Sequence, residues 1–456
     1  MGEKQRPTYS HYAELNRCSQ NGEYERALKV ANKILGVSPD EILALHCKLI
    51  CLIQLSKFDE AIALINRNPH YLKDILFEKA YCYYRANKPA DALKILNKSE
   101  DELDLRCKEL KAQILYRLEK YDEAAKMYHE NIKSTNDDYE EERYTNLSAV
   151  MVFLNRNDTE NQIDYLKDNT YELCYNKACI LIAHENYTEA EKKLKQCEKL
   201  CREALEEDEA AEEEIDIELA LIKVQLAYVY QKQGRIREAH QIYTATLKLK
   251  IEDMALIAAA SNNVVCINKD QNLFDSKKKM KAAMNEALVY KLPSRQRKYI
   301  ALNNAILNYY VNQTEICEKI CKNIEDTYPD LMIQILILRA LNLIKADKVK
   351  EAIELLKNTE REDNRLYLHL CIAQIHLMQG ERKEACKVLE NLGEHTYKPG
   401  IVGALTTLYL GLGDEQMALK VFERTVEYYK RNEHEIIAAI RSRLTSHFSS
   451  AQLLVA

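Results

Sequence analysis

A small residue returns along this 456-residue chain at a nearly constant interval. It is alanine each time: Ala27, Ala61, Ala92, Ala124, Ala190, Ala239, Ala352, Ala385 and Ala418. Most steps between successive alanines are close to one or two units of about 34 residues, the period of stacked pairs of antiparallel helices. The interval therefore predicts a repeat protein rather than a chain folded around one central core.

Three further positions keep the same register. An aromatic residue often lies three positions before the alanine, a turn residue five before, and a second small residue twelve before. The aromatics are Tyr24, Phe58, Tyr121 and Tyr187; the turn glycines are Gly22, Gly234, Gly380 and Gly413; the earlier alanines are Ala80, Ala112, Ala178, Ala227, Ala340 and Ala373. This combination is typical of tetratricopeptide repeats. We predict an all-α, right-handed solenoid of about twelve helix pairs, including degenerate units near Asn161, Lys277 and Ile316.

Composition agrees with an all-helical chain and limits the classes of partner that it can bind. The apolar content is 47%, with only 10 Gly and 7 Pro, and the formal charge is −6 from 71 acidic and 65 basic residues. A chain of this charge has no global basic field to attract nucleic acid. The most apolar stretch, Leu331 to Leu338, is far shorter than the roughly 20 residues that span a bilayer. We expect no membrane insertion and see no secretory signal in the first residues.

The 14 cysteines and the scattered histidines do not form a chemical signature. Cys47/Cys51, Cys197/Cys201 and Cys317/Cys321 are four residues apart, and no Cys-x-x-Cys pair of the kind that holds structural zinc occurs. We interpret the cysteines as small buried residues of a protein in a reducing compartment. Phosphate-binding, nucleophile-elbow and zinc-protease motifs are also missing from the sequence. We therefore predict no catalytic residue, metal, cofactor or small-molecule substrate.

The register also predicts which first-helix side chains face the concave side of such a solenoid. In the first four units we assign a partner-binding groove to eleven residues: Tyr12, Asn16, His46, Ile50, Phe77, Tyr81, Tyr84, Arg85, Gln113, Tyr116 and Arg117. Aromatic anchors with Arg and amide donors suit an extended peptide. The alternative is that some of them, Ile50 and Tyr84 above all, pack between neighbouring first helices.

Two charged segments interrupt the regular pattern. Glu203 to Asp216 falls in the long interval between Ala190 and Ala239, and we predict an extended helix followed by an acidic loop there. Lys277 to Lys279, with Lys269 and Lys281, is a basic cluster that we interpret as a solvated helix face rather than an RNA contact. The predicted division is residues 1–165 (N-terminal repeats with the groove), 166–430 (central and C-terminal repeats with the acidic insertion) and 431–456 (a C-terminal helix that caps the solenoid).

Several segments resemble one protein family rather than a general repeat consensus. They include Phe77-Glu-Lys-Ala-Tyr-Cys-Tyr-Tyr-Arg85, Asp137-Asp-Tyr-Glu-Glu-Glu-Arg143, and Ile267-Asn-Lys-Asp-Gln-Asn272 with Phe274-Asp-Ser-Lys-Lys-Lys279. The chain is similar, collinearly from about residue 8 to about residue 430, to the 72-kDa subunits of the signal recognition particle. The resemblance implies a cytoplasmic protein of the ribosome and endoplasmic reticulum targeting cycle, whose N-terminal repeats hold a C-terminal segment of the 68-kDa partner subunit.

The chain also departs from that family. Relatives continue into a lysine-rich tail with a Pro- and Trp-containing RNA-binding motif, whereas this sequence has no Trp and ends at Ala456. We therefore expect contact with the particle RNA to be indirect. The main hypothesis is a scaffold that holds a protein segment. The alternatives are an RNA-binding helical-repeat protein and an adaptor of another complex.

Overall fold

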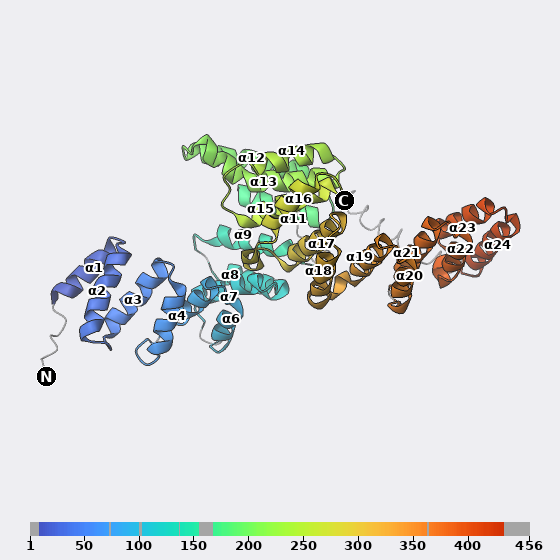
Figure 1. Cartoon of the computed structure of the whole chain (residues 1–456). Coiled ribbons are helices and arrows are strands. Elements are labelled where there is room, and N and C mark those ends of the chain that lie inside the picture. The colour runs from blue at the N-terminus through green and yellow to red at the C-terminus, as the bar shows by residue number, and fades with distance from the viewer. Residues whose placement is uncertain are drawn as a thin grey trace. The chain divides into compact units, whose positions relative to one another are not determined.

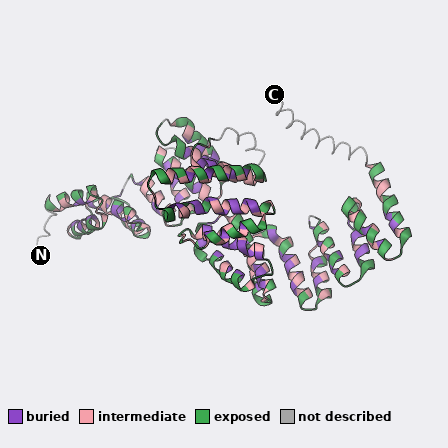
Figure 2. Ribbon diagram, turned by 90° about the horizontal axis from the view of Figure 1, so that it is seen from above, coloured by how far each residue is buried: buried purple, intermediate pink, exposed green. Residues whose placement is uncertain are grey.

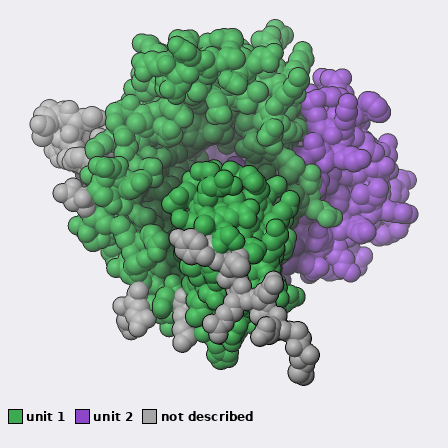
Figure 3. Space-filling view, turned by 90° about the vertical axis from the view of Figure 1, so that its left-hand side faces the viewer, with its two compact units in different colours: residues 1–267, 285–293 green, residues 268–284, 294–456 purple. Residues whose placement is uncertain are grey.

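The computed structural model describes residues 9–72, 74–99, 103–135, 137–154, 167–362 and 364–432. Every regular element in these ranges is a helix, so the all-α prediction is confirmed (Figure 1). The chain forms two compact units, which Figure 3 shows in different colours: residues 1–267 with 285–293, and residues 268–284 with 294–456. The predicted division after residue 165 thus falls within the residue range of the first unit. Residues 433–456, with the predicted C-terminal cap, lie outside the described residues.

The first unit contains the N-terminal and middle repeats. Its helices are α1 Tyr9–Gln20, α2 Tyr24–Val37, α3 Ile42–Gln54, α4 Phe58–Arg67, α5 Leu76–Arg85, α6 Pro89–Asn97, α7 Leu105–Arg117, α8 Tyr121–Ser134, α9 Glu140–Met151, α11 Tyr171–Ala183, α12 Tyr187–Glu207, α13 Glu212–Lys232, α14 Ile236–Thr246, α15 Met254–Asn268 and the 3-10 helix η3 Glu286–Tyr290.

The second unit contains the C-terminal repeats. Its helices are α16 Leu273–Ala283, α17 Ser294–Tyr310, α18 Thr314–Thr327, η4 Pro329–Leu331, α19 Met332–Lys345, α20 Val349–Asn358, α21 Arg365–Met378, α22 Arg382–Glu390, η5 Gly393–Tyr397, α23 Pro399–Gly411 and α24 Glu415–Arg431.

Within each unit the helices pack in the order of the chain. The two helices of a pair contact each other, as in α1 with α2 or α19 with α20, and the second helix of a pair contacts the first helix of the next, as in α2 with α3 or α20 with α21. Buried residues follow the faces on which helices meet, and exposed residues cover the outer faces (Figure 2). This nearest-neighbour packing is that of a helical-repeat solenoid, which confirms the predicted fold class.

The recurring alanines are buried between the paired helices. Eight of the nine are fully buried, and Ala418 is 4% exposed. The alanines twelve positions earlier are equally buried, with Ala80, Ala112, Ala178 and Ala227 at 0%. Because a methyl group lets two helix backbones approach closely and leaves little room for a larger side chain, both positions of each pair select small residues.

The turn five residues before each alanine has a left-handed backbone. Gly234 has φ +82°, and a Cβ added there would meet no atom within 4 Å, so only the backbone conformation favours glycine at this position. Residues other than glycine adopt the same conformation in six further repeats: Ser56, Asn87, Glu119, Glu185, Asn312 and Asp347, with φ between 57° and 61°. The left-handed turn is therefore shared by all nine repeats with a recurring alanine and by the Cys317 repeat, although its glycine is not.

Two of the degenerate units lie within the described residues and need a small correction of register. The residue buried at the crossing is Ser276 rather than Lys277, and Cys317 rather than Ile316; both are fully buried, whereas Lys277 and Ile316 are exposed. The thiol of Cys317 donates to the carbonyl of Ala305, twelve positions earlier, at 3.3 Å. The third unit, near Asn161, lies outside the described residues.

The long interval between Ala190 and Ala239 is built as an extended hairpin. Both α12 and α13 have 21 residues. The acidic segment begins in the last turn of α12, crosses a short turn at residues 208–211 and ends in the first turns of α13. The predicted extended helix is confirmed, but the predicted acidic loop is wrong, because most of the acidic residues are helical. Carboxylates in the first turn of α13 are favoured there by the helix dipole.

Candidate functional site

The eleven residues of the predicted groove lie on the first helices of four consecutive repeats, α1, α3, α5 and α7. We call this set the N-terminal face. Asn16, Ile50, Arg85 and Gln113 are exposed, and the other seven are partly buried. No member is fully buried, so each offers some surface to a partner.

The helix α3 contributes an exposed aliphatic stripe. Ile50 is 43% exposed, and Ile42, which is 52% exposed, lies two helical turns earlier on the same side of α3. His46 lies between them, and Leu43 is 56% exposed one position after Ile42. The groove prediction did not include Ile42 and Leu43. The unbroken apolar sequence Ile42-Leu-Ala-Leu45 was the signal that could have revealed them, since one side of a paired helix cannot bury all four.

The helix α5 carries an ordered aromatic cluster. The rings of Phe77 and Tyr81 stack with their centroids 5.8 Å apart, and Tyr81 meets the ring of Phe58 edge-on at 6.2 Å. The guanidinium of Arg85 lies 4.8 Å from the Phe58 centroid and donates a hydrogen bond of 2.5 Å to the Tyr81 hydroxyl. Such pairs contribute about 0.5–1.5 kcal/mol each beyond their buried area. The cluster therefore presents its rings in a fixed arrangement before any partner binds.

Arg117 differs from Arg85 because it joins two repeats. Its Nη1 donates to the carbonyl oxygen of Tyr84 at 2.9 Å, and its Nη2 donates to Oδ1 of Asn87 in the left-handed turn after α5. The guanidinium also lies 5.2 Å from the centroid of the Tyr84 ring. A guanidinium has five N–H donors, so part of its capacity is left for a partner. Arg117 therefore joins α7 to the preceding repeat, in addition to the role predicted for it as a hydrogen-bond donor to a partner.

Tyr116 lies in a second aromatic group, together with Tyr121 of α8 and Phe153 of the turn that follows α9. Its ring meets Tyr121 at 5.8 Å and Phe153 at 6.0 Å, both edge-on, and Tyr121 stacks on Phe153 at 4.5 Å. Burial raises the pKa of the Tyr116 hydroxyl. Tyr116 therefore supports the packing of α7 against α8 and against the turn that follows α9. Tyr121, the aromatic that precedes Ala124 by three positions, fills the gap between the helices as the repeat pattern predicts.

At the N-terminal end of this face, Tyr12 is tied to the next repeat. Its pKa is raised first by burial and then by the charge and hydrogen bond of Glu41, which precedes α3. The face is therefore lined by aromatic rings from α1 to α7, with aliphatic side chains on α3 and guanidinium groups on α5 and α7. Such a surface can accept apolar side chains and donate hydrogen bonds to carbonyl or carboxylate oxygens.

The described residues offer little for metal chemistry. All fourteen cysteines are free thiols, ten of them buried. In the part of the chain that the structure describes, no three His, Cys, Asp or Glu side chains converge in a way that could hold a metal ion. The same described ranges contain no helix both long and apolar enough to cross a membrane.

Comparison with known proteins places the N-terminal repeats in a defined family. Residues 20–153 match the SRP_TPR_like family of TPR-like repeats. The chain is 41% identical over 430 residues to signal recognition particle subunit SRP72 of Homo sapiens, covering 92% of this chain and 64% of that protein. It is 33% identical over 452 residues to SRP72 of Schistosoma mansoni, and 30% identical over 451 residues to SRP72 of Dictyostelium discoideum. The chain thus spans slightly less than two thirds of the length of these relatives. These relatives are named as subunits of the signal recognition particle and not as enzymes.

Proposed function

The chain is a homologue of the signal recognition particle subunits called SRP72, and on this basis we propose that it holds a partner protein within that particle through its N-terminal face. The observation that carries the proposal is the fixed arrangement of Phe77, Tyr81 and Arg85 on α5. Ile50, on the first helix of the preceding repeat, adds an exposed aliphatic side chain. A surface that is ordered before binding loses little conformational entropy when a peptide docks. The match to the SRP_TPR_like family, over residues 20–153, covers α3, α5 and α7 of this face but not Tyr12 and Asn16 of α1.

We further propose that the bound segment is the C-terminal part of the 68-kDa subunit, the partner implied by the family resemblance. Cytoplasmic location, participation in targeting to the endoplasmic reticulum and indirect contact with the particle RNA belong to the same proposal. A net charge of −6 supports indirect rather than direct contact with the particle RNA, because phosphate binding needs a basic surface.

The test is a titration of the full chain with fluorescent peptides that tile the C-terminal part of the 68-kDa subunit, read by anisotropy. We expect one peptide to bind, and Ile50→Asp and Tyr81→Ala each to weaken it about ten-fold or more, as expected for central anchors of an interface. Tyr81→Phe keeps the ring and removes only the hydroxyl that bonds Arg85, so it separates the two contributions. Tyr116 is not a suitable probe, because its replacement would also loosen the packing against Phe153.

The control is Tyr367→Ala, which removes a tyrosine that is 55% exposed on α21 in the other unit. Equal affinity of all four variants and the wild-type chain would contradict the assignment to the N-terminal face. The RNA-binding alternative is tested by titrating the particle RNA at several salt concentrations. Tight RNA binding that falls steeply with salt would favour that alternative over the protein scaffold.

A further inference from the structure

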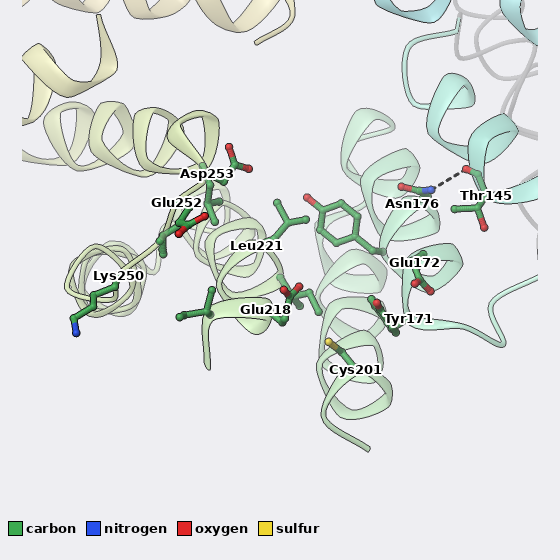
Figure 4. A pocket seen from close by; sticks show the side chains of 15 residues that line it. Thr145, Tyr171, Glu172, Asn176, Cys201, Glu218, Leu221, Lys250, Glu252 and Asp253 are labelled. Carbon is green, nitrogen blue, oxygen red and sulfur yellow. Dashed lines mark hydrogen bonds between the residues drawn. The ribbon is translucent and has the colours of Figure 1, made fainter. Parts of the chain in front are cut away.

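The first unit contains a pocket of about 670 Å³ between its middle repeats. Residues of α9, α11, α13 and α15 line it, together with Cys201 of α12 and the segment 250–253 that precedes α15. Figure 4 shows Leu221 near the middle of this pocket, Cys201 and Glu218 on one side, Glu252 and Asp253 on another, and Thr145 and Asn176 at the far end. We call it the middle-repeat pocket. None of its lining residues belongs to the N-terminal face.

The pocket exists because of the long interval between Ala190 and Ala239. The helix α12 continues far beyond Ala190 and ends at Glu207, whereas α4 ends at Arg67, less than two turns after its alanine. The helix α13 likewise begins about two turns earlier relative to its alanine than α3 does. Cys201, Ile217 and Glu218 lie in these added turns and form one wall. A regular repeat would lack this wall, so the insertion makes a concave site that the repeat pattern alone does not contain.

The inner surface of the middle-repeat pocket is apolar. Ile222, Leu256 and Cys201 are buried, and the partly buried ring of Tyr175 lies beside them. Leu221 is 45% exposed although it lines a pocket rather than an outer face. Covering an apolar side chain that is exposed inside a concave, mostly apolar surface with another apolar group is favourable, because it removes apolar surface from water.

The rim of the pocket is acidic. Glu172, Glu218, Glu252 and Asp253 line it together with a single base, Lys250. The carboxylate of Asp253 accepts a hydrogen bond of 2.8 Å from the backbone N–H of Ala255. Among the described residues, none of these four carboxylates forms an ion pair with a basic side chain. The rim therefore has negative charge that nothing in the described fold neutralises.

The acidic turn at the tip of the α12–α13 hairpin extends the same charge. Nine of the fourteen residues from Glu203 to Asp216 are acidic and none is basic. Four ion pairs involve this segment, made by Lys199, Arg202 and Lys223. Within the described part of the chain, more than half of the nine carboxylates have no basic partner. Clustered charge of one sign next to a cleft raises the local concentration of ligands of the opposite sign.

We propose that the middle-repeat pocket is a second protein-binding site, which takes a segment rich in lysine or arginine that carries an aliphatic or aromatic side chain. The apolar side chain covers Leu221 and Ile222, and the flanking bases meet Glu218 and Glu252. Charge complementarity selects this class of segment, because an acidic segment or the phosphates of RNA would be repelled by the same rim. The site goes beyond the proposed function, since it uses neither the residues nor the partner chemistry of the N-terminal face.

Three fluorescent peptides test the proposal on the full chain, with binding read by anisotropy. The probe repeats Lys-Leu-Lys-Ala three times; one control replaces Leu by Ser, and the other replaces Lys by Glu. We expect the Lys/Leu peptide to bind, and the Lys/Ser and Glu/Leu peptides to bind about ten-fold more weakly or not at all. Equal binding of the Lys/Ser peptide would mean attraction by charge alone and would overturn the proposal. Failure of the Lys/Leu peptide to bind, or preference for the Glu/Leu peptide or an RNA oligonucleotide, would also overturn it.

Variants then locate the site. Leu221→Ser should weaken the Lys/Leu peptide about ten-fold or more, and its matched control is Leu410→Ser, which replaces a leucine that is 54% exposed on α23 of the other unit. Glu218→Gln with Glu252→Gln should weaken binding and reduce its dependence on salt, whereas Glu354→Gln with Glu415→Gln removes the same charge from exposed positions of the second unit without effect. All four of the glutamates that are replaced by glutamine are exposed, so these variants should fold even if Leu221→Ser does not. Loss of binding in the control variants equal to that in the pocket variants would exclude the assignment.

Discussion

Single side chains decide how open the N-terminal face is to a partner. Arg85 and Arg117 occupy equivalent positions of successive repeats, yet Arg85 bonds a tyrosine of its own helix and Arg117 bonds a carbonyl and an amide of the preceding repeat. The difference comes from Asn87, whose side chain lies in reach of Arg117 at a turn with φ +60°. A register of helical positions predicts the two arginines equally well, but it contains no information about the turn residue that one of them contacts.

The ionisation of Glu191 should change the free energy of unfolding. Burial raises the pKa of its carboxyl, but hydrogen bonds from Lys195, Gln233 and Arg235 outweigh this effect and lower the pKa to about 2. Lys195 donates at 2.7 Å, and Gln233 and Arg235 at 3.1 Å, so the carboxylate joins α12 to the turn between α13 and α14. A carboxyl whose folded pKa lies below its unfolded value stabilises the fold above the unfolded value, and this stabilisation is lost as pH falls through the folded pKa.

We therefore predict that Glu191→Gln lowers the free energy of unfolding by about 1 kcal/mol at pH 7, the usual net worth of such contacts. The difference from the wild-type chain should shrink between about pH 4.5 and pH 2, where the wild-type carboxylate itself becomes protonated. Urea unfolding followed by circular dichroism at several pH values measures this difference in the free energy of unfolding. Glu130→Gln, at an exposed position of α8, is the control. A difference that stays constant down to pH 2 would show that the ionised form of Glu191 does not matter.

At the scale of helices, the sequence predicted the repeat register well and its exceptions poorly. The buried alanines, the paired helices and the left-handed turns all follow from one spacing. The shift to Ser276 and Cys317 could not be predicted, because serine and cysteine are small enough to replace alanine but are common at other positions too. For the N-terminal face, the spacing predicted helices and sides, whereas the roles of Tyr116 and Arg117 depend on Phe153 and Asn87, which follow no periodic rule.

The close contact at the alanines leads to a prediction for one helix, α6. Ala92 is fully buried against α5, and Ala90 is exposed two residues earlier on the same helix. Ala92→Leu should cost about 1–3 kcal/mol, since the added atoms must push the paired helices apart. Ala90→Leu should change stability by less than about 0.5 kcal/mol. Urea midpoints of the two variants make the comparison. Similar midpoints would mean that the pair tolerates a wider spacing than the buried alanines indicate.

The whole molecule distributes its buried apolar residues unevenly. One cluster of 20 buried residues spans α11 to α15, whereas the other described clusters hold six to nine each. The large cluster includes the inner ends of the extended hairpin, with Cys201, Ile215 and Leu219 all buried. The insertion that forms the middle-repeat pocket thus also enlarges the apolar core beneath it. In a repeat protein each unit contacts only its neighbours, so local stability should follow the local amount of buried surface.

This argument predicts the order in which the chain opens. Native-state hydrogen exchange at rising urea should show the amides of α11 to α15 exchanging last, because opening them exposes the largest buried cluster. Amides of α1 and α2, and of α23 and α24, should exchange first, since each of these pairs has a packed neighbour on one side only within the described residues. Mass spectrometry of peptic fragments resolves the two groups. Leu219→Ala, which opens a cavity in the large cluster, should lower the protection of α11 to α15 while leaving that of α23 and α24 unchanged. If all helices instead exchange together at one urea concentration, the chain unfolds as a single cooperative body, and the uneven distribution of buried residues does not set its local stability.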